Sequence, residues 1–194
     1  GRCYEGKKYF FGEERKRIWE KVFQESIERF EIQIYAWVLL DNHYHILFSL
    51  PQSIDNTSDS PRTDFALAQS ITPLFSNERN DEMSATNFVT QHKTQVLTEF
   101  IRKLHKDTSR ILNKHDQHKG RTVWYQYFDY CIRNIPDFWK HFNYILKNPL
   151  KHGLVHSLEE SLLYPHSSNP TWLRRFGAES IHEGFCKYPV KEVI

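Results

Sequence analysis

Three segments of the chain predict helices. In residues 13–30 and 97–115, apolar side chains recur every three or four positions between charged ones, as on an amphipathic helix. Residues 134–153, "NIPDFWKHFNYILKNPLKHG", carry end signals instead: Asn134 or Ile135 opens the helix, Pro136 takes the first helical position and the glycine closes it. Pro149 lies inside this segment and predicts a break or kink there.

Strands are predicted where β-branched and aromatic residues cluster. "IQIYAWVLL" and "HYHILFSL" flank the polar pair Asp41-Asn42, which predicts a β-hairpin with a tight turn. Residues 122–133, "TVWYQYFDYCIR", alternate well enough for a half-buried strand. Residues 51–96 are rich in Ser, Asn, Asp and Thr and read as a polar surface insertion, while 154–194 form a C-terminal extension with no assignable elements. The length predicts a single domain over 1–194, in which the apolar stripe of the helix at 13–30 covers a sheet.

Composition narrows the class of protein without naming a partner. The chain has 194 residues, and its 26 Lys and Arg against 24 Asp and Glu leave a net charge of +2, which by itself does not call for nucleic acid. Cys3, Cys131 and Cys186 have no zinc or disulfide spacing, so a reducing, cytoplasmic compartment is expected. No apolar run reaches the roughly 18 residues of a membrane span, and we expect no membrane partner.

The hairpin contains two histidines inside an apolar run, in "WVLLDNHYHILFSL". Residues two apart on a strand point to the same face, so His43 and His45 project side by side while Tyr44 points the other way. Two imidazoles arranged in this way can bind one metal ion. The same pattern occurs in many strands without a ligand role, so the interpretation requires a third ligand.

A candidate third ligand lies in "YILKNPLKHG", where Tyr144 and Asn148 are four residues apart and leave the same face of the predicted helix. Each residue alone has an ordinary explanation, as a buried tyrosine or as an Asn that ends a helix before Pro. Together with the histidines, the Asn148 amide oxygen would hold Mg²⁺ or Mn²⁺ with positions open for a phosphate oxygen. Tyr144 could then attack that phosphorus, with Lys147 and Lys151 as neighbouring cations or simply as solvated side chains.

A tyrosine nucleophile has a particular consequence. Its attack on a phosphodiester forms a phosphotyrosine that retains the bond energy, so the strand can be rejoined to another hydroxyl without ATP. The expected task is therefore to rejoin the cleaved strand rather than to degrade it. A basic stripe on the helix at 97–115 is either a phosphate-facing track or a solvated face; it consists of Lys103, Lys106, Arg110 and Lys114.

Four stretches of the chain resemble one known family. They are "YAWVLLDNHYHILFSLP", "LTEFIRKLHKDTSRILNK", "VWYQYFDYCIRNIPDFWKHFNYILKNPLKHGLV" and, weakly, "YPHSS". An H-x-H hairpin followed by Y-x-x-x-N-P resembles the HUH-type, single-tyrosine transposases, and among them the group associated with repetitive extragenic palindromes (REP). The resemblance implies a ferredoxin-like α+β fold, in which a central antiparallel sheet carries the histidines and helices pack on it.

The resemblance also implies roles for individual residues. His43 and His45 match the paired metal ligands, Tyr144 matches the nucleophile, and Asn148 matches the residue that completes the metal site. Members of the family use Mg²⁺ or Mn²⁺ to cleave single-stranded DNA near a hairpin, leaving a free 3′-OH and a 5′-phosphate joined to the tyrosine. Because Asn148 stands where two-tyrosine relatives often carry a second tyrosine, the one-tyrosine branch is favoured.

Further expectations follow from the family. Arg121 and Arg133 could extend the basic stripe along DNA, and Trp124 and Tyr125 could stack on unpaired bases or pack in the core. A monomer is favoured over a homodimer, and a first strand is expected upstream of "GRCYEGKKYFF". Two alternatives stay open: a domesticated protein that binds structured DNA without strand transfer, and a metal hydrolase that uses water as its nucleophile.

Overall fold

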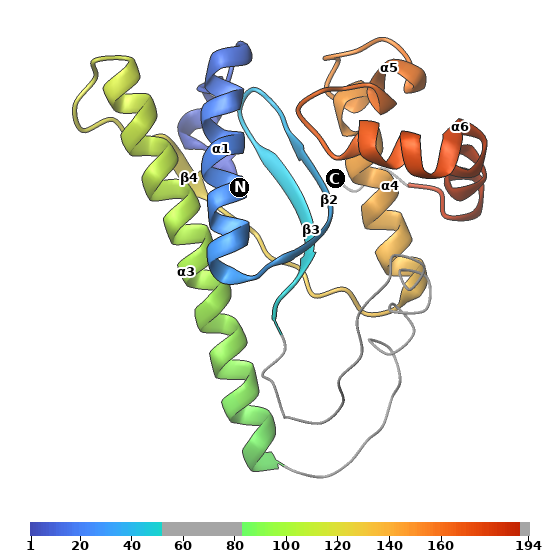
Figure 1. Ribbon diagram of the computed structural model, residues 1–194, viewed down its shortest axis with the longest axis horizontal. Coiled ribbons are helices and arrows are strands. Elements are labelled where there is room, and N and C mark those ends of the chain that lie inside the picture. Colours follow the sequence, from blue (N-terminus) through green and yellow to red (C-terminus); the bar gives the residue numbers. More distant parts are fainter. Residues whose placement is uncertain (52–82, 191–194) are drawn as a thin grey trace.

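The elements of the fold follow one another as strand, helix, two strands, helix and strand, and then further helices. The computed structural model describes residues 1–51 and 83–190, with the side chains of helix α3 described from Thr94 onward. Figure 1 labels the elements, which are β1 (Arg2–Cys3), the 3₁₀ turn η1 (Tyr4–Gly6), α1 (Glu13–Phe30), β2 (Gln33–Leu39), β3 (Tyr44–Ser49), α3 (Met83–His115), β4 (Trp124–Gln126), α4 (Ile135–Lys151), α5 (Leu158–Leu162) and α6 (Asn169–Lys187).

The strands form two antiparallel pairs that meet along one edge. β2 pairs with β3, and β1 pairs with β4. A bridge between Arg2 and His43 joins the two pairs, and the Tyr44 amide donates a 2.9 Å hydrogen bond to the Gly1 carbonyl. This contact places β1 beside β3 and gives the order β2-β3-β1-β4. With α1 between β1 and β2 and α3 between β3 and β4, the arrangement is ferredoxin-like, as predicted.

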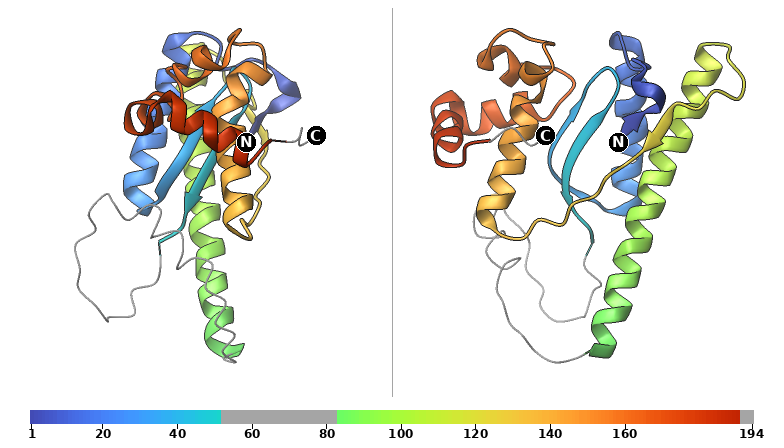
Figure 2. Two further views of the ribbon diagram at one scale, coloured as in Figure 1. Left: turned by 90° about the vertical axis from the view of Figure 1, so that its right-hand side faces the viewer. Right: turned by 180° about the vertical axis from the view of Figure 1, so that it is seen from behind.

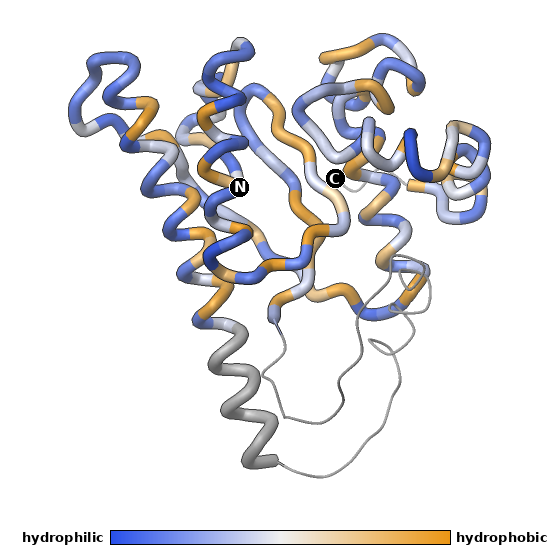
Figure 3. The backbone as a smooth tube through the Cα atoms, viewed as in Figure 1, coloured by the Kyte–Doolittle hydropathy of each residue, from blue (hydrophilic) through white to orange (hydrophobic). Residues whose placement is uncertain are grey.

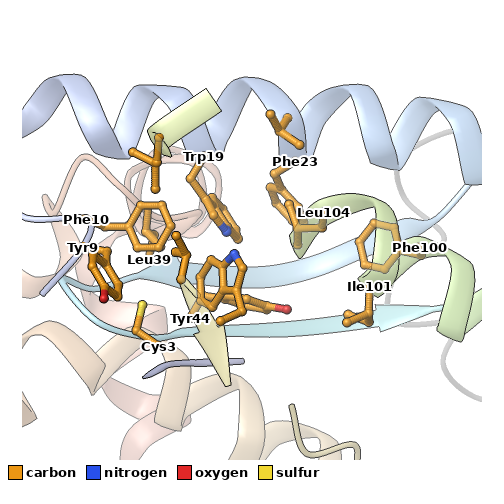
Figure 4. Packing of buried hydrophobic residues seen from close by; sticks show 14 of the residues in the cluster. Cys3, Tyr9, Phe10, Trp19, Phe23, Leu39, Tyr44, Phe100, Ile101 and Leu104 are labelled. Atoms are coloured by element: carbon orange, nitrogen blue, oxygen red, sulfur yellow. The ribbon is translucent and has the colours of Figure 1, made fainter. Parts of the chain in front are cut away.

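The hairpin is buried on both faces. On the α1 and α3 side, Tyr44 and Leu39 pack in a core with Trp19 of α1 and Phe100 of α3 (Figure 4). On the other side, neighbouring residues of the same strands form a second core with α4, α5 and α6, which includes Val38, Leu47, Phe142, Leu146, Leu162 and Trp172. Strands covered on both faces read as continuous apolar runs, which explains the pattern of the hairpin sequence.

The C-terminal extension, which sequence patterns left unassigned, covers the free edge of the hairpin. The Leu39 amide donates to the His166 carbonyl at 2.9 Å, and the Ser168 amide donates to the Trp37 carbonyl at 2.9 Å. Trp172 at the start of α6 donates from its indole nitrogen to the Tyr35 carbonyl at 2.8 Å. The extension thus satisfies the edge of β2, which would otherwise present unpaired backbone groups. Figure 2 shows α5 and α6 packed beside α4.

Three sequence expectations need correction. Helix α3 begins at Met83, so part of the predicted insertion 51–96 is helical, while residues 52–82 lie outside the described residues. The strand predicted over 122–133 is only Trp124–Gln126, because its described partner β1 offers two residues for pairing. α4 continues through Pro149 to Lys151. A proline in the final turn removes one hydrogen bond where the helix is about to end, so no break follows.

Hydrophobic and hydrophilic residues alternate along the described helices (Figure 3). Among the described helices, none is both long and apolar enough to cross a membrane.

An ion-pair network fastens the end of α3 to α1. Asp116 accepts a 2.9 Å hydrogen bond from Arg15 and forms a 2.7 Å ion pair with Arg121. Burial raises the pKa of Asp116, but contacts with His115, Arg121 and Arg15 outweigh it and lower the pKa to about 2. A carboxyl with a depressed folded pKa stabilises the fold above its unfolded pKa, and this contribution is lost as pH falls through the folded value.

We therefore expect the free energy of unfolding to drop between about pH 4 and pH 2, and Asp116→Asn to reduce this drop. At pH 7 the same variant should lower stability by about 1–2 kcal/mol, measured by urea unfolding. Glu99→Gln is the control, because Glu99 pairs with Arg102 on an exposed helix surface and should contribute less than about 0.5 kcal/mol. Equal effects of the two variants would contradict a stabilising network at Asp116.

Candidate active site

The two histidines lie where the hairpin turn meets β3. The Leu40 amide donates to the His43 carbonyl at 2.8 Å, which closes the predicted Asp41-Asn42 turn. The rings of His43 and His45 are 5.2 Å apart between centroids. Both imidazoles face α4, whereas Tyr44 is buried on the opposite face beside Trp19. The strand alternation predicted from the sequence is therefore observed.

Helix α4 begins and ends on local signals. The Asn134 side chain accepts a 2.9 Å hydrogen bond from the Asp137 amide, and Pro136 occupies the second helical position. At the other end, Gly153 has a φ of 66° and its amide donates to the Leu150 carbonyl, while Leu154 donates to Pro149. This Schellman-type ending needs a left-handed residue, which glycine adopts without strain.

Residues 144, 148 and 152 follow one another at intervals of about one helical turn and share one side of α4. Tyr144 lies 5.2 Å from the ring of His45, and His152 lies 4.6 Å from the ring of His43, measured between centroids. Asn148 stands between these two contacts. The structure thus brings His43, His45 and Tyr144 together between β3 and α4, with Asn148 one helical turn after Tyr144 on the same side of the helix.

Three buried polar atoms at this place have no hydrogen-bond partner among the described residues. Asn148 is completely buried, and neither its amide oxygen nor its amide nitrogen has a hydrogen-bond partner among the described residues. The Nε2 atom of His45 is also buried without a partner in the described part of the chain. Leaving a buried polar group unsatisfied costs about 1–3 kcal/mol, so such groups in a folded protein call for an explanation.

A divalent ion fits these donors. An amide oxygen and imidazole nitrogens are ligands that Mg²⁺ or Mn²⁺ can use, and binding would satisfy the unpartnered Asn148 oxygen and His45 nitrogen. Within residues 1–51 and 83–190, no group of three His, Cys, Asp or Glu side chains is arranged to hold a metal. The candidate set therefore depends on the amide of Asn148 and carries no negative charge.

Electrostatics keep both histidines neutral. Burial is the main cause that lowers the pKa of His43 to about 4, and the neighbouring His152, Arg2 and Lys151 contribute to the same shift. Burial likewise lowers the pKa of His45 to about 3, with His43 as the next cause. Both imidazoles are therefore unprotonated at pH 7, as metal ligands must be. The nearby Arg2 and Lys151 make the surroundings favourable for an anion.

The sequence pattern predicts only a turn role for Asn42, whereas in the structure its side chain also contacts His43. Its amide nitrogen donates to the Gly6 carbonyl at 3.0 Å, which directs its amide oxygen to Nδ1 of His43 at 2.7 Å. An amide oxygen at that distance accepts a hydrogen bond from Nδ1–H, so the Nε2 atom of His43 keeps its lone pair. The available signal was the position of Asn42 immediately before the histidine. Arg2 and His152 were also missed, because only tertiary packing brings them to His43.

The predicted DNA-contacting residues are dispersed. Lys103 and Arg110 both pair with Asp107 on α3, and Arg121 belongs to the Asp116 network. Lys106 and Lys114 are exposed on α3. Three others lie over aromatic rings, namely Arg133 on Tyr130, Lys147 on Phe185 and Lys151 on Tyr144. Of the eight, Lys151 is the residue that the structure brings to the histidine site.

Comparisons with known proteins agree with the motif. No family model matches the chain. A curated protein of Haemophilus influenzae, named a REP-associated tyrosine transposase, is 23% identical over 147 residues, which is 75% of this chain and 64% of the relative. The chain thus spans less than two thirds of that relative. A solved structure of a REP-associated tyrosine transposase bound to a REP hairpin shares the fold, with a TM-score of 0.52 and 18% identity over 93% of this chain and 77% of the other. The resemblance seen in the motifs is confirmed.

Proposed function

We propose that this chain, which resembles the REP-associated tyrosine transposases in sequence and fold, cleaves and rejoins single-stranded DNA near a hairpin through Tyr144. One observation carries the proposal. The fully buried Asn148 amide has no described partner and stands between the contacts that Tyr144 and His152 make with the two histidines. A buried amide without a partner lowers stability, so a purely structural role does not explain Asn148 at that position. A role as a metal ligand beside a nucleophile does explain it.

The proposed metal ligands are His43, His45 and Asn148, with Mg²⁺ or Mn²⁺ as the ion. When bound, the ion polarises a phosphate oxygen and stabilises the charge that develops during phosphoryl transfer. Because the three ligands are neutral, the protein does not compensate the charge of the ion. A DNA phosphate is suited to do so, and Arg2 and Lys151 beside His43 favour its approach.

The reaction follows from the placement of Tyr144. Its hydroxyl oxygen attacks phosphorus and forms the tyrosyl–phosphate bond, while the bond from phosphorus to the 3′ oxygen breaks. The phenolic proton is lost to solvent, and the leaving 3′ oxygen gains a proton to become a free 3′-OH. Lys151 lies 4.9 Å above the Tyr144 ring, where its charge favours the developing phenolate. Attack by another 3′-OH on the phosphotyrosine reverses the step and rejoins the strand.

We propose that one chain acts alone on its DNA. Tyr144 on α4 already meets His45 of β3 in the same chain, so the site needs no helix from a second copy. The proposed substrate, single-stranded DNA next to a hairpin, is supported by the hairpin that the structural neighbour binds.

An adduct assay tests the proposal. The protein is incubated with Mn²⁺ and an oligonucleotide that carries a hairpin and labelled single-stranded flanks. We expect a covalent protein–DNA species on a denaturing gel and a released strand that a polymerase can extend from its 3′-OH. Binding without either product would favour a structured-DNA-binding protein, and cleavage without an adduct would favour a metal hydrolase that uses water.

The contact of Asn42 with His43 makes a separate prediction about metal affinity. Asn42→Ala removes the acceptor that holds the proton on Nδ1, and losing such an outer partner lowers metal affinity by about 10- to 100-fold. Isothermal titration with Mn²⁺ measures the change, and thermal unfolding of the metal-free protein checks the fold. Asn42→Asp keeps an oxygen acceptor but loses the hydrogen bond to the Gly6 carbonyl, so its Mn²⁺ affinity should lie between those of Asn42→Ala and the parent. Unchanged affinity in Asn42→Ala would show that the hydrogen bond does not orient the ligand.

A further inference from the structure

Exposed aromatic rings gather on the segment that follows the start of β4. Four of its side chains are exposed, namely Tyr125 by 62%, Tyr127 by 37%, Phe128 by 86% and Tyr130 by 53%, and we call residues 125–130 the aromatic segment. Tyr4 of η1, exposed by 38%, contacts Tyr125 with 6.0 Å between ring centroids. Large aromatic rings are usually buried in a soluble domain, so a cluster of exposed ones marks a surface that meets a partner.

A groove of about 480 Å³ lies between α3 and the first part of this segment. Tyr125 and Tyr127 line it together with Arg102, Lys106 and Arg121, and none of the described residues that line it is acidic. The base of the groove packs against the central sheet. Trp124 stacks on His105 with centroids 4.6 Å apart, and the His105 Nε2 lies 2.8 Å from the Tyr44 hydroxyl of the central sheet. The buried Trp124 is thus part of the core, and the exposed tyrosines form the accessible surface.

The chemistry of the surface matches an unpaired nucleic-acid strand. Flat aromatic faces stack on bases that are not paired, and the cations beside them attract the phosphates between those bases. A paired duplex hides its base faces and would contact mainly the cations. Arg133 and Tyr130 form a further pair of a cation and an exposed ring on this surface, because the Arg133 guanidinium lies over the Tyr130 ring.

The aromatic segment begins in β4, which β1 alone separates from the histidine site within the sheet. Gln126 of β4 lies opposite Arg2 of β1, and Arg2 lies opposite His43. Neighbouring strands are about 4.8 Å apart, so β4 is roughly 10 Å from the histidine across the sheet. In the view from behind, Figure 2 shows the chain after β4 crossing directly to the start of α4, which carries Tyr144. The segment therefore leads from β4 toward the helix that carries the proposed nucleophile.

We propose that the groove and the aromatic segment form a stacking platform for unpaired bases of the single strand that flanks the hairpin. The platform holds that strand in place relative to Tyr144 and distinguishes flanked hairpins from bare ones. The inference rests on the proposed function, since it assigns a surface to the substrate of that reaction.

Binding measurements without metal test the platform separately from cleavage. Fluorescence anisotropy in EDTA compares one labelled hairpin that carries a single-stranded flank with the same hairpin lacking it. Tyr125→Ala and Phe128→Ala should each weaken binding of the flanked hairpin by about 5- to 100-fold and leave binding of the bare hairpin within about twofold. Tyr125→Trp should retain the parent affinity. Phe11→Ala is the control, because Phe11 is 69% exposed but lies outside the segment.

Two outcomes would overturn the platform: no loss of affinity in either alanine variant, or an equal loss for flanked and bare hairpins. Both variants replace exposed side chains, so the fold should persist, and far-ultraviolet circular dichroism checks it. A parent protein that prefers flanked hairpins but forms no adduct with Mn²⁺ would refute the proposed cleavage and leave the platform intact. A parent protein that forms the adduct but binds flanked and bare hairpins equally well would refute the platform and leave the proposed cleavage intact.

Discussion

Tyr144→Phe should abolish the covalent protein–DNA adduct, with a loss of strand cleavage of about 10³-fold or more. The substitution removes the hydroxyl that attacks phosphorus and leaves the ring, which contacts His45 and Lys151. Mn²⁺ binding and hairpin binding should therefore remain within a fewfold of the parent. Denaturing gels of reactions with a labelled, flanked hairpin measure the adduct directly.

Tyr188→Phe provides a matched control for this experiment. Tyr188 follows α6 and its ring stacks on Trp139, so the variant removes a phenolic hydroxyl outside the histidine site and outside the aromatic segment and keeps the ring. We expect it to form the adduct at the rate of the parent. If Tyr144→Phe still formed the adduct, another residue would be the nucleophile. If the variant still cleaved without an adduct, water would be the nucleophile.

Asn148→Leu should have opposite effects on stability and on metal binding. Leucine has a similar size but no polar atoms, so it removes two buried groups that lack described partners. We expect the metal-free protein to become more stable by about 1 kcal/mol, which raises the melting temperature by roughly 2–4 °C. Losing the amide oxygen should weaken Mn²⁺ binding by at least about tenfold and eliminate adduct formation.

Asn143→Leu is the corresponding control on the same helix. Asn143 is also buried, but its amide donates to the Gly184 carbonyl at 3.0 Å and to the Tyr188 carbonyl at 2.9 Å. Removing it should lower stability by about 1–3 kcal/mol and leave Mn²⁺ affinity unchanged. Calorimetric melting and titration of both variants provide the comparison. A destabilised Asn148→Leu that still bound Mn²⁺ would make Asn148 a structural residue and remove the main support for the site.

Some features of the fold could not be predicted because they depend on distant partners. The extension at 154–194 contains Pro, Gly and Ser, and its pairing with β2 through His166 and Ser168 has no local signature. For β4, the sequence pattern predicts a strand that is longer than the observed one. Alternation continues to residue 133, yet pairing ends at Gln126 because the described part of β1 pairs only through Arg2 and Cys3. Sequence periodicity reports the capacity to form a strand, and the partner sets its length.

The sequence by itself determined which side chains share a face. A period of two placed His43 and His45 on one side of β3, and a period near 3.6 placed Tyr144 and Asn148 on one side of α4, because backbone geometry sets both repeats within a few residues. Only the tertiary structure decided that these two faces meet, that Asn148 is buried between them without a described partner, and that Asn42, Arg2 and His152 surround His43. The meeting of the two faces comes from packing between segments about a hundred residues apart, which no local pattern records, and the contact of Asn42 depends on how the hairpin turn sets the two neighbouring side chains.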